Sequence, residues 1–298
     1  MTSGKPCIPC IGSVLWDIIG RHGHAMGLGA DRPGTITRLP GGVALNVAMT
    51  LVRFGMQPTV LTAIGTDADG HHLIDECARL GIDTRHALRR SDLPTDRYMA
   101  IEGLNGLIAA IADAQSLEAA GNAILAPLAD GRLGTADAPF SGAMVLDGNL
   151  SEDVLTEIAD SPLFAKASLR IVPASPGKAT RLRPLLTMAN ATLYLNLEEA
   201  EILAETSFRS SAEAASALVK AGSARVLVTH GAQAATDACP EEVHTAHPPQ
   251  IEPRRITGAG DTFVAAHIAA ESAGHQRPFA LGAAIHAAAT YVSGTDSP

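Results

Sequence analysis

A short glycine-rich turn near the C-terminus combines an anion-binding backbone with a carboxylate. The segment reads Thr257-Gly258-Ala259-Gly260-Asp261 and runs directly into an alanine-rich, helix-forming stretch. Glycines allow positive φ and close approach of a ligand, and the first amides of a helix have no intrahelical acceptor, so these amides favour a phosphate. The nearby carboxylate has two explanations: Asp261 either caps the helix or acts as a general base that removes a proton from a hydroxyl group.

A second glycine turn precedes another predicted helix within residues 39–55. Gly41 and Gly42 come just before apolar residues at helical spacing, and Gly55 supplies a C-terminal stop. Asn46 lies one turn into this helix, beside the apolar stripe rather than at its centre. It is therefore either an ordinary helix-surface amide or an amide that reaches back over the glycine turn to a polar ligand.

Short apolar runs alternate with helix-period segments along the chain. The predicted strands are residues 7–14, 59–65, 143–148, 169–174, 191–196 and 225–231. The predicted helices are residues 44–55, 71–81, 151–160, 198–205 and 211–222. This alternation predicts an α/β fold with a central, mainly parallel sheet flanked by helices. In such sheets ligands bind at the carboxyl ends of the strands.

Two insertions interrupt this alternation. Residues 95–118 contain two extended runs around Gly-Leu-Asn-Gly, which is a hairpin signal, and a further extended run near residues 18–40 precedes Gly41. We expect the two insertions to form a small β lid. No repeat, low-complexity tract or linker divides the sequence, so residues 1–298 are predicted to form a single domain.

Composition and charge narrow the range of partners. With 298 residues, 46% of them hydrophobic and only 3% aromatic, the chain is expected to bury a large core of Ala, Leu, Ile and Val. The net charge of -9 and the absence of a basic run interleaved with aromatics argue against nucleic acid. No apolar run reaches the roughly 18–20 residues of a membrane span, and the N-terminus lacks a signal-peptide layout. These features predict a cytoplasmic protein.

The cysteines and histidines give little indication of a metal site. Cys7 and Cys10 form a C-x-x-C, a spacing found in metal and redox pairs, but no second pair follows and both residues lie in a predicted strand. Buried free thiols are the favoured interpretation. The histidines, including His71, His72 and His230, show no ligand spacing and are interpreted as surface or packing residues.

Both glycine turns, taken in order, resemble the signatures of the ribokinase-like, phosphofructokinase-B family of sugar and nucleoside kinases. The signatures are Gly-Gly-Val-Ala-Leu-Asn at residues 41–46 and Thr-Gly-Ala-Gly-Asp at residues 257–261. The Gly-x-Asp-x-x-Gly run at 65–70, the Asn-x-x-Glu at 196–199 and the turn at 228–233 are also similar to the family. The resemblance spans essentially the whole chain. It implies a ribokinase-like sheet with a β lid that often pairs two subunits, and ATP-dependent phosphorylation of a hydroxymethyl group.

The resemblance also implies a role for each candidate residue. Asp261 is expected to be the general base, and Gly258, Ala259 and Gly260 the anion hole. The expected substrate-binding residues are Asp17, Gly41, Gly42, Asn46 and Asp113, although a solvent-exposed hairpin end explains Asp113 nearly as well. The expected ATP-binding residues are Asn196, Thr229, Gly231 and Thr257. Asn196 and Glu199 are expected to hold Mg²⁺ through water, whereas Glu199 taken alone reads as a first-turn helix acid.

Within the family, the pseudouridine kinase branch fits best. Residues 31–46 and 98–113 are similar to that branch, and they imply the 5′-hydroxyl of pseudouridine as the acceptor, with another small sugar or riboside as the alternative. The expected partner is this small molecule, and a homodimer through the lid is expected.

Several positions depart from the family pattern. Arg255 and Ile256 stand where Asp-Thr or Asn-Val usually precedes the second signature, next to a site for a monovalent cation, so little dependence on K⁺ is expected. Leu45 replaces an Arg of the pseudouridine branch and is expected to alter its ligand contacts. Val172 replaces an aspartate, and Ala234 replaces a glycine of the nucleotide-binding turn.

Two other classes of function compete with a kinase as interpretations of the sequence. A dinucleotide-dependent oxidoreductase requires G-x-G-x-x-G after the first strand, where this chain has Gly-Ser-Val-Leu-Trp-Asp at residues 12–17. A non-catalytic sugar or nucleoside sensor on the kinase scaffold stays open, and a measurement of ATP turnover separates it from an enzyme.

Overall fold

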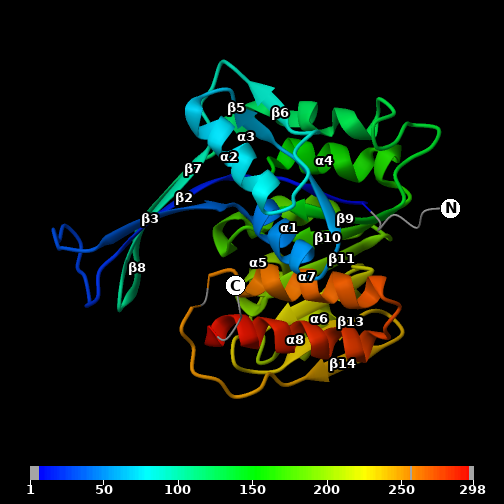
Figure 1. Ribbon diagram of the computed structural model, residues 1–298. Helices are drawn as coiled ribbons and strands as arrows, with labels where there is room; N and C mark the ends of the chain where they lie inside the picture. Colours follow the sequence, from blue (N-terminus) through cyan, green and yellow to red (C-terminus); the bar gives the residue numbers. More distant parts are fainter. Residues whose placement is uncertain (1–6, 256, 295–298) are drawn as a thin grey trace.

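The computed structural model describes residues 7–255 and 257–294; Ile256, one of the departures named above, lies outside them. Its centre is an eight-stranded sheet with the order β14-β13-β12-β11-β10-β9-β1-β4 (Figure 1). The parallel strands are β1 (Cys7–Ile11), β4 (Gln57–Leu61), β9 (Gly142–Asp147), β10 (Ala167–Val172), β11 (Ala191–Asn196) and β12 (Arg225–Thr229). The antiparallel edge consists of β13 (Ala235–Ala238) and β14 (Val243–Ala246). The predicted mainly parallel sheet is confirmed.

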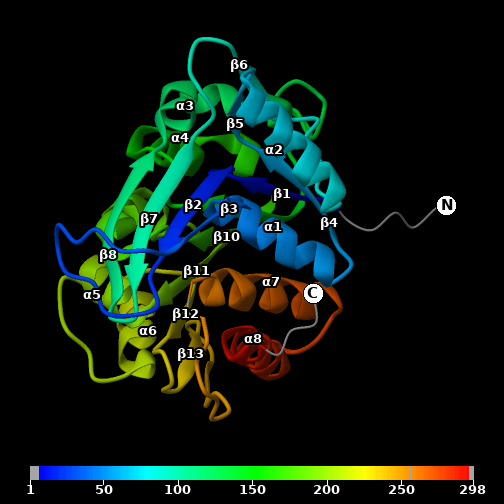
Figure 2. The same ribbon diagram turned by 60° about the vertical axis from the view of Figure 1, so that its left-hand side comes forward.

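Helices cover both faces of this sheet. Figure 2 shows α1 (Val43–Arg53), α7 (Ala259–Ser272) and α8 (Arg277–Ser293) side by side on one face, with α2 (Ala68–Arg79) beyond α1. The other face packs against α3 (Gln115–Ala120), α4 (Glu152–Asp160), α5 (Leu197–Ala204), α6 (Ser211–Lys220) and the 3₁₀ helices η1 (Gly121–Leu128), η2 (Pro162–Phe164) and η3 (Pro176–Leu185). Successive side chains of a strand point to opposite faces, so Val145 and Leu146 belong to two separate hydrophobic clusters.

A second, four-stranded sheet projects from the body at the side where the parallel strands of the main sheet have their carboxyl ends (Figure 1). It has the order β3-β2-β7-β8, with β2 (Leu15–Arg21), β3 (Thr35–Gly41), β7 (Arg97–Gly103) and β8 (Gly106–Asp113). A further pair, β5 (Ala63–Gly65) and β6 (Leu88–Arg90), lies beside the main sheet. We refer to the four strands as the second sheet.

The first predicted strand, residues 7–14, is shorter in the structure, and the reason is Gly12. Strand β1 ends at Ile11, and the chain then passes through Gly12, whose φ is 145°, before β2 begins in the second sheet. A Cβ at Gly12 would collide with the Asp147 side chain. The glycine therefore lets the chain leave one sheet for the other at a point of close packing.

Side-chain caps determine where several helices begin. The Asp67 side chain accepts a hydrogen bond from the Gly70 amide at the start of α2 and another from the Thr95 amide just before β7, which ties the helix to the second sheet. Ser151 and Ser210 cap α4 and α6 in the same way. No helix in the described ranges is both long enough and apolar enough to cross a bilayer.

Cys7 and Cys10 are free thiols within β1. Because side chains alternate along a strand, residues three apart face opposite sides of the sheet. This geometry keeps the two thiols from sharing a metal ion.

Candidate active site

A cavity of about 480 Å³ lies where the parallel strands end, beneath the second sheet. Ser13 follows β1, Asn149 follows β9, Asn196 ends β11 and Thr229 ends β12, and all of them line the cavity. Tyr98 of β7 lines it from the second sheet. The cavity thus occupies the place where α/β sheets bind ligands.

The two glycine turns of the sequence meet in this cavity. Asn46 Nδ2 of α1 donates a hydrogen bond of 2.9 Å to Asp261 Oδ2 of α7, across 215 residues of sequence. Helix α7 begins at Ala259, and its N-cap is Gly258, with φ of 90°. Among the hydrogen bonds between described residues, Asp261 accepts from Asn46 and from no amide of its own first turn, so the geometry favours the base over the cap.

Three carboxylates face the cavity, and each has a raised pKa. Burial raises the pKa of Asp261 to about 7; the Asn46 hydrogen bond opposes this shift, and the negative charges nearby add to it. Burial also raises the pKa of Asp17 to about 6 and that of Glu199 to about 7. A carboxylate with a pKa near neutrality is well matched to taking a proton from a hydroxyl group.

Asp17 reaches the cavity because Gly41 leaves space around its carboxylate. It lies on β2, opposite Leu39 of β3 and Tyr98 of β7. Any Cβ at Gly41 would collide with the Asp17 carboxylate, and a Cβ at Gly42 would lie 2.5 Å from the Ser13 carbonyl oxygen. Gly42 has φ of 98° and is the N-cap of α1. Gly42 lines the cavity, whereas Gly41 shapes it by giving room to Asp17.

Asn196 and Glu199 form a capping box at the start of α5. The Asn196 side chain accepts from the Glu199 amide and the Glu199 carboxylate accepts from the Asn196 amide, both at 2.8 Å. Both residues also line the cavity, so the structural role and the cavity-facing role coexist.

The fit of a divalent ion depends on how many protein ligands it requires. The described ranges contain no cluster of three or more His, Cys, Asp or Glu side chains placed to hold a metal ion. Mg²⁺ keeps most of its water and needs only one or two carboxylates together with substrate phosphates. Glu199, with Asn196 beside it, therefore fits a hydrated ion.

The remaining candidate residues divide between the cavity and its surroundings. Thr229, Thr257 and Gly260 line the cavity, whereas Gly231, Ala259 and Asp113 do not. Gly231 lies in the turn after β12 with φ of 54°. Asp113 accepts a hydrogen bond from Gln115, and it alternates with Ala112 and Ala114, which do line the cavity.

Leu45 lies in the core next to Asn46 in the sequence. It is fully buried in the hydrophobic cluster beneath α1 and does not line the cavity. Successive helix residues point in different directions, so Asn46 faces the cavity while Leu45 faces the core. Leu45 therefore makes no contact in the cavity itself, and the expectation that replacing the Arg of the pseudouridine branch alters the ligand contacts stays a prediction.

The sequence interpretation missed a polar hub at the ends of β1 and β9. The buried Asp147 side chain accepts hydrogen bonds from the amides of Ser13, at 2.8 Å, and Asn149, at 2.7 Å. Ser13 Oγ in turn accepts from the Val43 amide at 2.9 Å, which fixes the first turn of α1. The Asp-Gly-Asn that follows the apolar run 143–146 is the signal that would have revealed this hub.

Lys178 is the basic residue among those that line the cavity. Its ammonium donates a hydrogen bond of 2.6 Å to Asn149 Oδ1. Burial lowers the pKa of Lys178, and the neighbouring Arg181 adds to this effect. The cavity wall therefore contains one lysine, which is hydrogen-bonded to Asn149, and three carboxylates.

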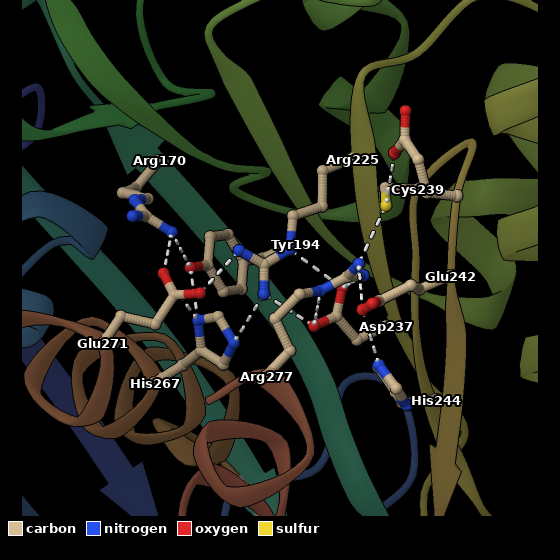
Figure 3. A network of polar contacts seen from close by, with 11 residues as sticks. Arg170, Tyr194, Arg225, Asp237, Cys239, Glu242, His244, His267, Glu271 and Arg277 are labelled. Carbon is tan, nitrogen blue, oxygen red and sulfur yellow. Dashed lines mark hydrogen bonds and ion pairs between the residues drawn. The ribbon is translucent and has the colours of Figure 1, made fainter. Parts of the chain in front are cut away.

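An ion-pair network holds α7 against the main sheet behind the cavity (Figure 3). Glu271 of α7 pairs with Arg170 of β10 at 2.6 Å and also with Arg225 of β12. Asp237 of β13 pairs with Arg225 and with Arg277 of α8, both at 2.6 Å. The network connects both helices to β10, β12 and β13, and it fixes the helix whose first turn carries Asp261.

Tyr194 links this network to the cavity. Its hydroxyl lies 2.9 Å from His267 Nδ1 (Figure 3), and Tyr194 and Phe263 both line the cavity. Arg225 contacts His267 Nε2 at 3.3 Å, and because a guanidinium only donates, that nitrogen is the acceptor of a neutral imidazole. Burial lowers the pKa of His267 to about 4, which agrees with a neutral ring.

Known pseudouridine kinases are similar to this chain in sequence. The pseudouridine kinase of Escherichia coli (strain K12) is 28% identical over 200 residues, which are 67% of this chain and 61% of that protein. The pseudouridine kinase of Arabidopsis thaliana is 28% identical over 247 residues, 76% of this chain and 63% of that protein. The chain thus spans about three-fifths of the length of these relatives.

Solved structures share the fold over nearly the whole chain. A carbohydrate kinase from Agrobacterium tumefaciens superposes with a TM-score of 0.79 at 26% identity, covering 98% of this chain and 94% of that one. A ribokinase from Thermotoga maritima gives a TM-score of 0.74 at 22% identity, covering 96% and 92%. The sequence profile of the pfkB family carbohydrate kinases matches residues 5–297. The chain belongs to the pfkB family of carbohydrate kinases.

Proposed function

We propose that the protein transfers the γ-phosphoryl group of ATP to the hydroxymethyl group of a small sugar or nucleoside. The observation that carries this proposal is the Asn46–Asp261 pair, which places a carboxylate with a pKa near neutrality in a cavity beside the first turn of α7. Family membership supports the reaction class.

Each cavity residue then has a task in the transfer. Asp261 accepts the proton of the acceptor hydroxyl, and Asn46 holds the carboxylate in place through its 2.9 Å hydrogen bond. The amides at the start of α7 donate to the oxygens of the transferred group, where the helix dipole also favours negative charge. Asp17, which lines the cavity, would accept hydrogen bonds from vicinal hydroxyls of the acceptor.

Glu199 would hold Mg²⁺ through water, with Asn196 beside it, and the bound ion would neutralise charge on the ATP phosphates. The capping box keeps the Glu199 side chain in one position at the cavity wall.

A neutral acceptor suits the cavity better than a phosphorylated sugar. Asp17, Glu199 and Asp261 would repel an acceptor phosphate, and the cation of Lys178 is engaged by Asn149. The aromatic side chain of Tyr98 lies at the roof of the cavity and offers a surface for a flat base. Together with the similarity to pseudouridine kinases, these features make pseudouridine the best candidate, with another small riboside as the alternative.

A panel of acceptors tests the proposal. The measurement is kcat/KM with ATP and Mg²⁺ for pseudouridine, uridine, adenosine, ribose and fructose 6-phosphate, with mass analysis of the product. We expect a 5′-phosphorylated product and a preference for pseudouridine. A preference for a free or phosphorylated sugar would overturn the acceptor, and ligand binding without any turnover would favour a sensor.

We also infer that two copies of the chain pair through the second sheet. One surface of this sheet exposes a row of large apolar side chains: Ile36 (78%), Met99 (48%), Ile101 (43%) and Ile111 (70%). Met99 and Ile111 are register partners on neighbouring strands, so these two side chains share a face. Analytical ultracentrifugation should show a dimer that Ile111→Glu dissociates; a monomeric native protein would contradict the inference.

A further inference from the structure

The segment that leads into the anion-binding turn is fastened to the C-terminal end of α8. Residues 247–255 form neither helix nor strand. The amides of Arg254 and Arg255 both donate to the Val292 carbonyl oxygen, at 2.9 and 3.2 Å. The last turn of α8 therefore determines where the chain enters Thr257 and Gly258.

The Arg255 side chain reinforces this attachment through Tyr291. Arg255 Nε donates a hydrogen bond of 2.7 Å to the Tyr291 carbonyl oxygen, and the guanidinium lies 3.8 Å from the centre of the Tyr291 ring. The hydroxyl of the same tyrosine donates to the Thr257 carbonyl oxygen at 2.9 Å. Tyr291 is thus held by Arg255 at one end and holds the anion-binding turn at the other.

Gly258 shows how closely this tyrosine fits the turn. A Cβ at Gly258 would lie 2.6 Å from the Tyr291 hydroxyl oxygen, and Gly258 has φ of 90°. The turn that presents the first amides of α7 is therefore shaped by a side chain whose own position depends on Arg255.

The electrostatics of the helix end favour a positive charge at this place. The last carbonyls of a helix have no intrahelical donors, and the dipole gives them partial negative charge. The Arg255 guanidinium supplies a fixed cation there, only two residues before Thr257.

A dissociable monovalent cation, which the family resemblance implies near this turn, does not fit beside Arg255. The Tyr291 carbonyl already accepts from Arg255 Nε and from the Gly294 amide, at 2.7 and 3.0 Å. The Val292 carbonyl accepts the two amides described above. With these oxygens engaged and a guanidinium charge adjacent, a second cation would be repelled.

We propose that Arg255 is a positioning residue that replaces the dissociable cation and keeps the anion-binding turn in its phosphate-binding shape. This inference deepens the proposed function, since the turn is the one expected to bind the ATP phosphates.

The test compares Arg255→Ala and Arg255→Lys with the matched control Arg79→Ala, which removes an exposed arginine paired with Glu76 on α2. ATP affinity is measured by calorimetry, and amide hydrogen exchange is followed in the peptide that spans Thr257 to Phe263. Each is measured in KCl, guanidinium chloride or choline chloride at about 20 mM and equal ionic strength.

We expect Arg255→Ala to weaken ATP binding about ten-fold, the scale of a lost cation at a helix C-terminus, and to speed exchange in the turn. Guanidinium or K⁺, but not choline, should restore much of the loss. Arg255→Lys should lie between the native protein and Arg255→Ala, and the native protein should change less than two-fold between KCl and choline chloride.

Three results would overturn the inference. Arg255→Ala could match Arg79→Ala in both ATP affinity and amide exchange, its loss of ATP affinity could be restored by no cation, or the native protein could depend strongly on K⁺. Failure of the proposed function is distinguishable, because it would appear as a native protein without turnover or ATP binding. Hydrogen exchange in the turn reports the Arg255 effect even then.

Discussion

The molecule buries carboxylates in two regions, and their pKa values shift in opposite directions there. In the network behind the cavity, burial alone would raise the pKa of Asp237, but the Arg225 and Arg277 guanidinium groups lower it to about 2. In the cavity, burial raises the pKa of Asp261 to about 7. Among the ion pairs between described residues none involves Asp17, Glu199 or Asp261.

The difference between the two regions lies in the partner and not in the depth. Asp237 is fully buried and Glu199 is 6% exposed, yet only Asp237 meets arginines. A paired carboxylate stays ionised and fastens elements together, whereas an unpaired one takes up protons near neutral pH and is available for chemistry. The same helix, α7, carries both kinds, with Asp261 in its first turn and Glu271 in its last.

The largest effect is expected on stability, when an arginine of the ion-pair network behind the cavity is removed. Arg225→Met removes the guanidinium shared by Asp237 and Glu271, and we expect the free energy of unfolding to fall by about 3 kcal/mol because each carboxylate loses one of its two arginine partners. Urea denaturation measures this. Arg79→Met, at an exposed pair, should change stability by less than about 1 kcal/mol; equal effects of the two substitutions would show that the network adds nothing.

Removing the unpaired carboxylate should affect catalysis rather than folding. Asp261→Asn keeps the shape of the side chain but deletes the base, so kcat should fall by about a hundred-fold or more. Steady-state kinetics with the best acceptor provide the measurement, and Asp130→Asn, at an exposed pair with Arg132, serves as the control. Near-normal turnover of Asp261→Asn would assign Asp261 a structural role only.

A smaller effect is expected at the proposed metal position. Glu199→Gln removes a charge from the cavity wall while keeping the length of the side chain, so the Mg²⁺ concentration that gives half-maximal rate should rise about ten-fold. The exposed neighbour Glu198→Gln provides the comparison and should leave this concentration unchanged. A reaction that proceeds without divalent ions would rule the metal site out.

Because Asp261 is unpaired, its ionisation should destabilise the fold slightly, and removing the carboxylate should make the protein more stable. The pKa of Asp261 in the folded protein, about 7, exceeds the ordinary value of 3.8, so ionisation is costlier in the folded chain. The penalty is absent below about pH 4, grows between pH 4 and 7, and is complete above pH 7. Asp261→Asn should therefore raise Tm at pH 8 and raise it less at pH 5. A lowered Tm at pH 8 would indicate that the carboxylate stabilises the fold.

The sequence predicted those parts of the site that local motifs encode. Gly42, Asn46 and Asp261 each belong to a turn that enters a helix, and the chemistry of such a turn is visible within a few residues. Asn196 and Glu199 were visible for the same reason, because a capping box has fixed spacing. The alternation of short apolar runs with helical segments was likewise enough for the main sheet.

The remainder depends on contacts that the fold creates. Asp147 binds Ser13 across 134 residues, and Glu271 binds Arg170 across 101. The Asp-Gly-Asn at the end of β9 marks Asp147 as a polar position but does not reveal its distant partner Ser13. Nothing near Glu271 in the sequence shows that it is paired, because its arginine partners come from strands of the main sheet. Gly231 and Asp113 show the converse: both are of the expected residue type, yet neither lines the cavity.

The most direct test of the account is the pH dependence of kcat/KM for the acceptor at saturating ATP and Mg²⁺. Asp261 must be ionised to act as a base, and its pKa is about 7. The value of kcat/KM should therefore be half-maximal near pH 7, approach its maximum above that pH, and fall towards ten-fold per pH unit below it. The residual activity of Asp261→Asn should lack this titration. A native profile that is flat between about pH 5.5 and 8.5, or one that Asp261→Asn retains, would contradict the claim that Asp261 is the unpaired base of this cavity.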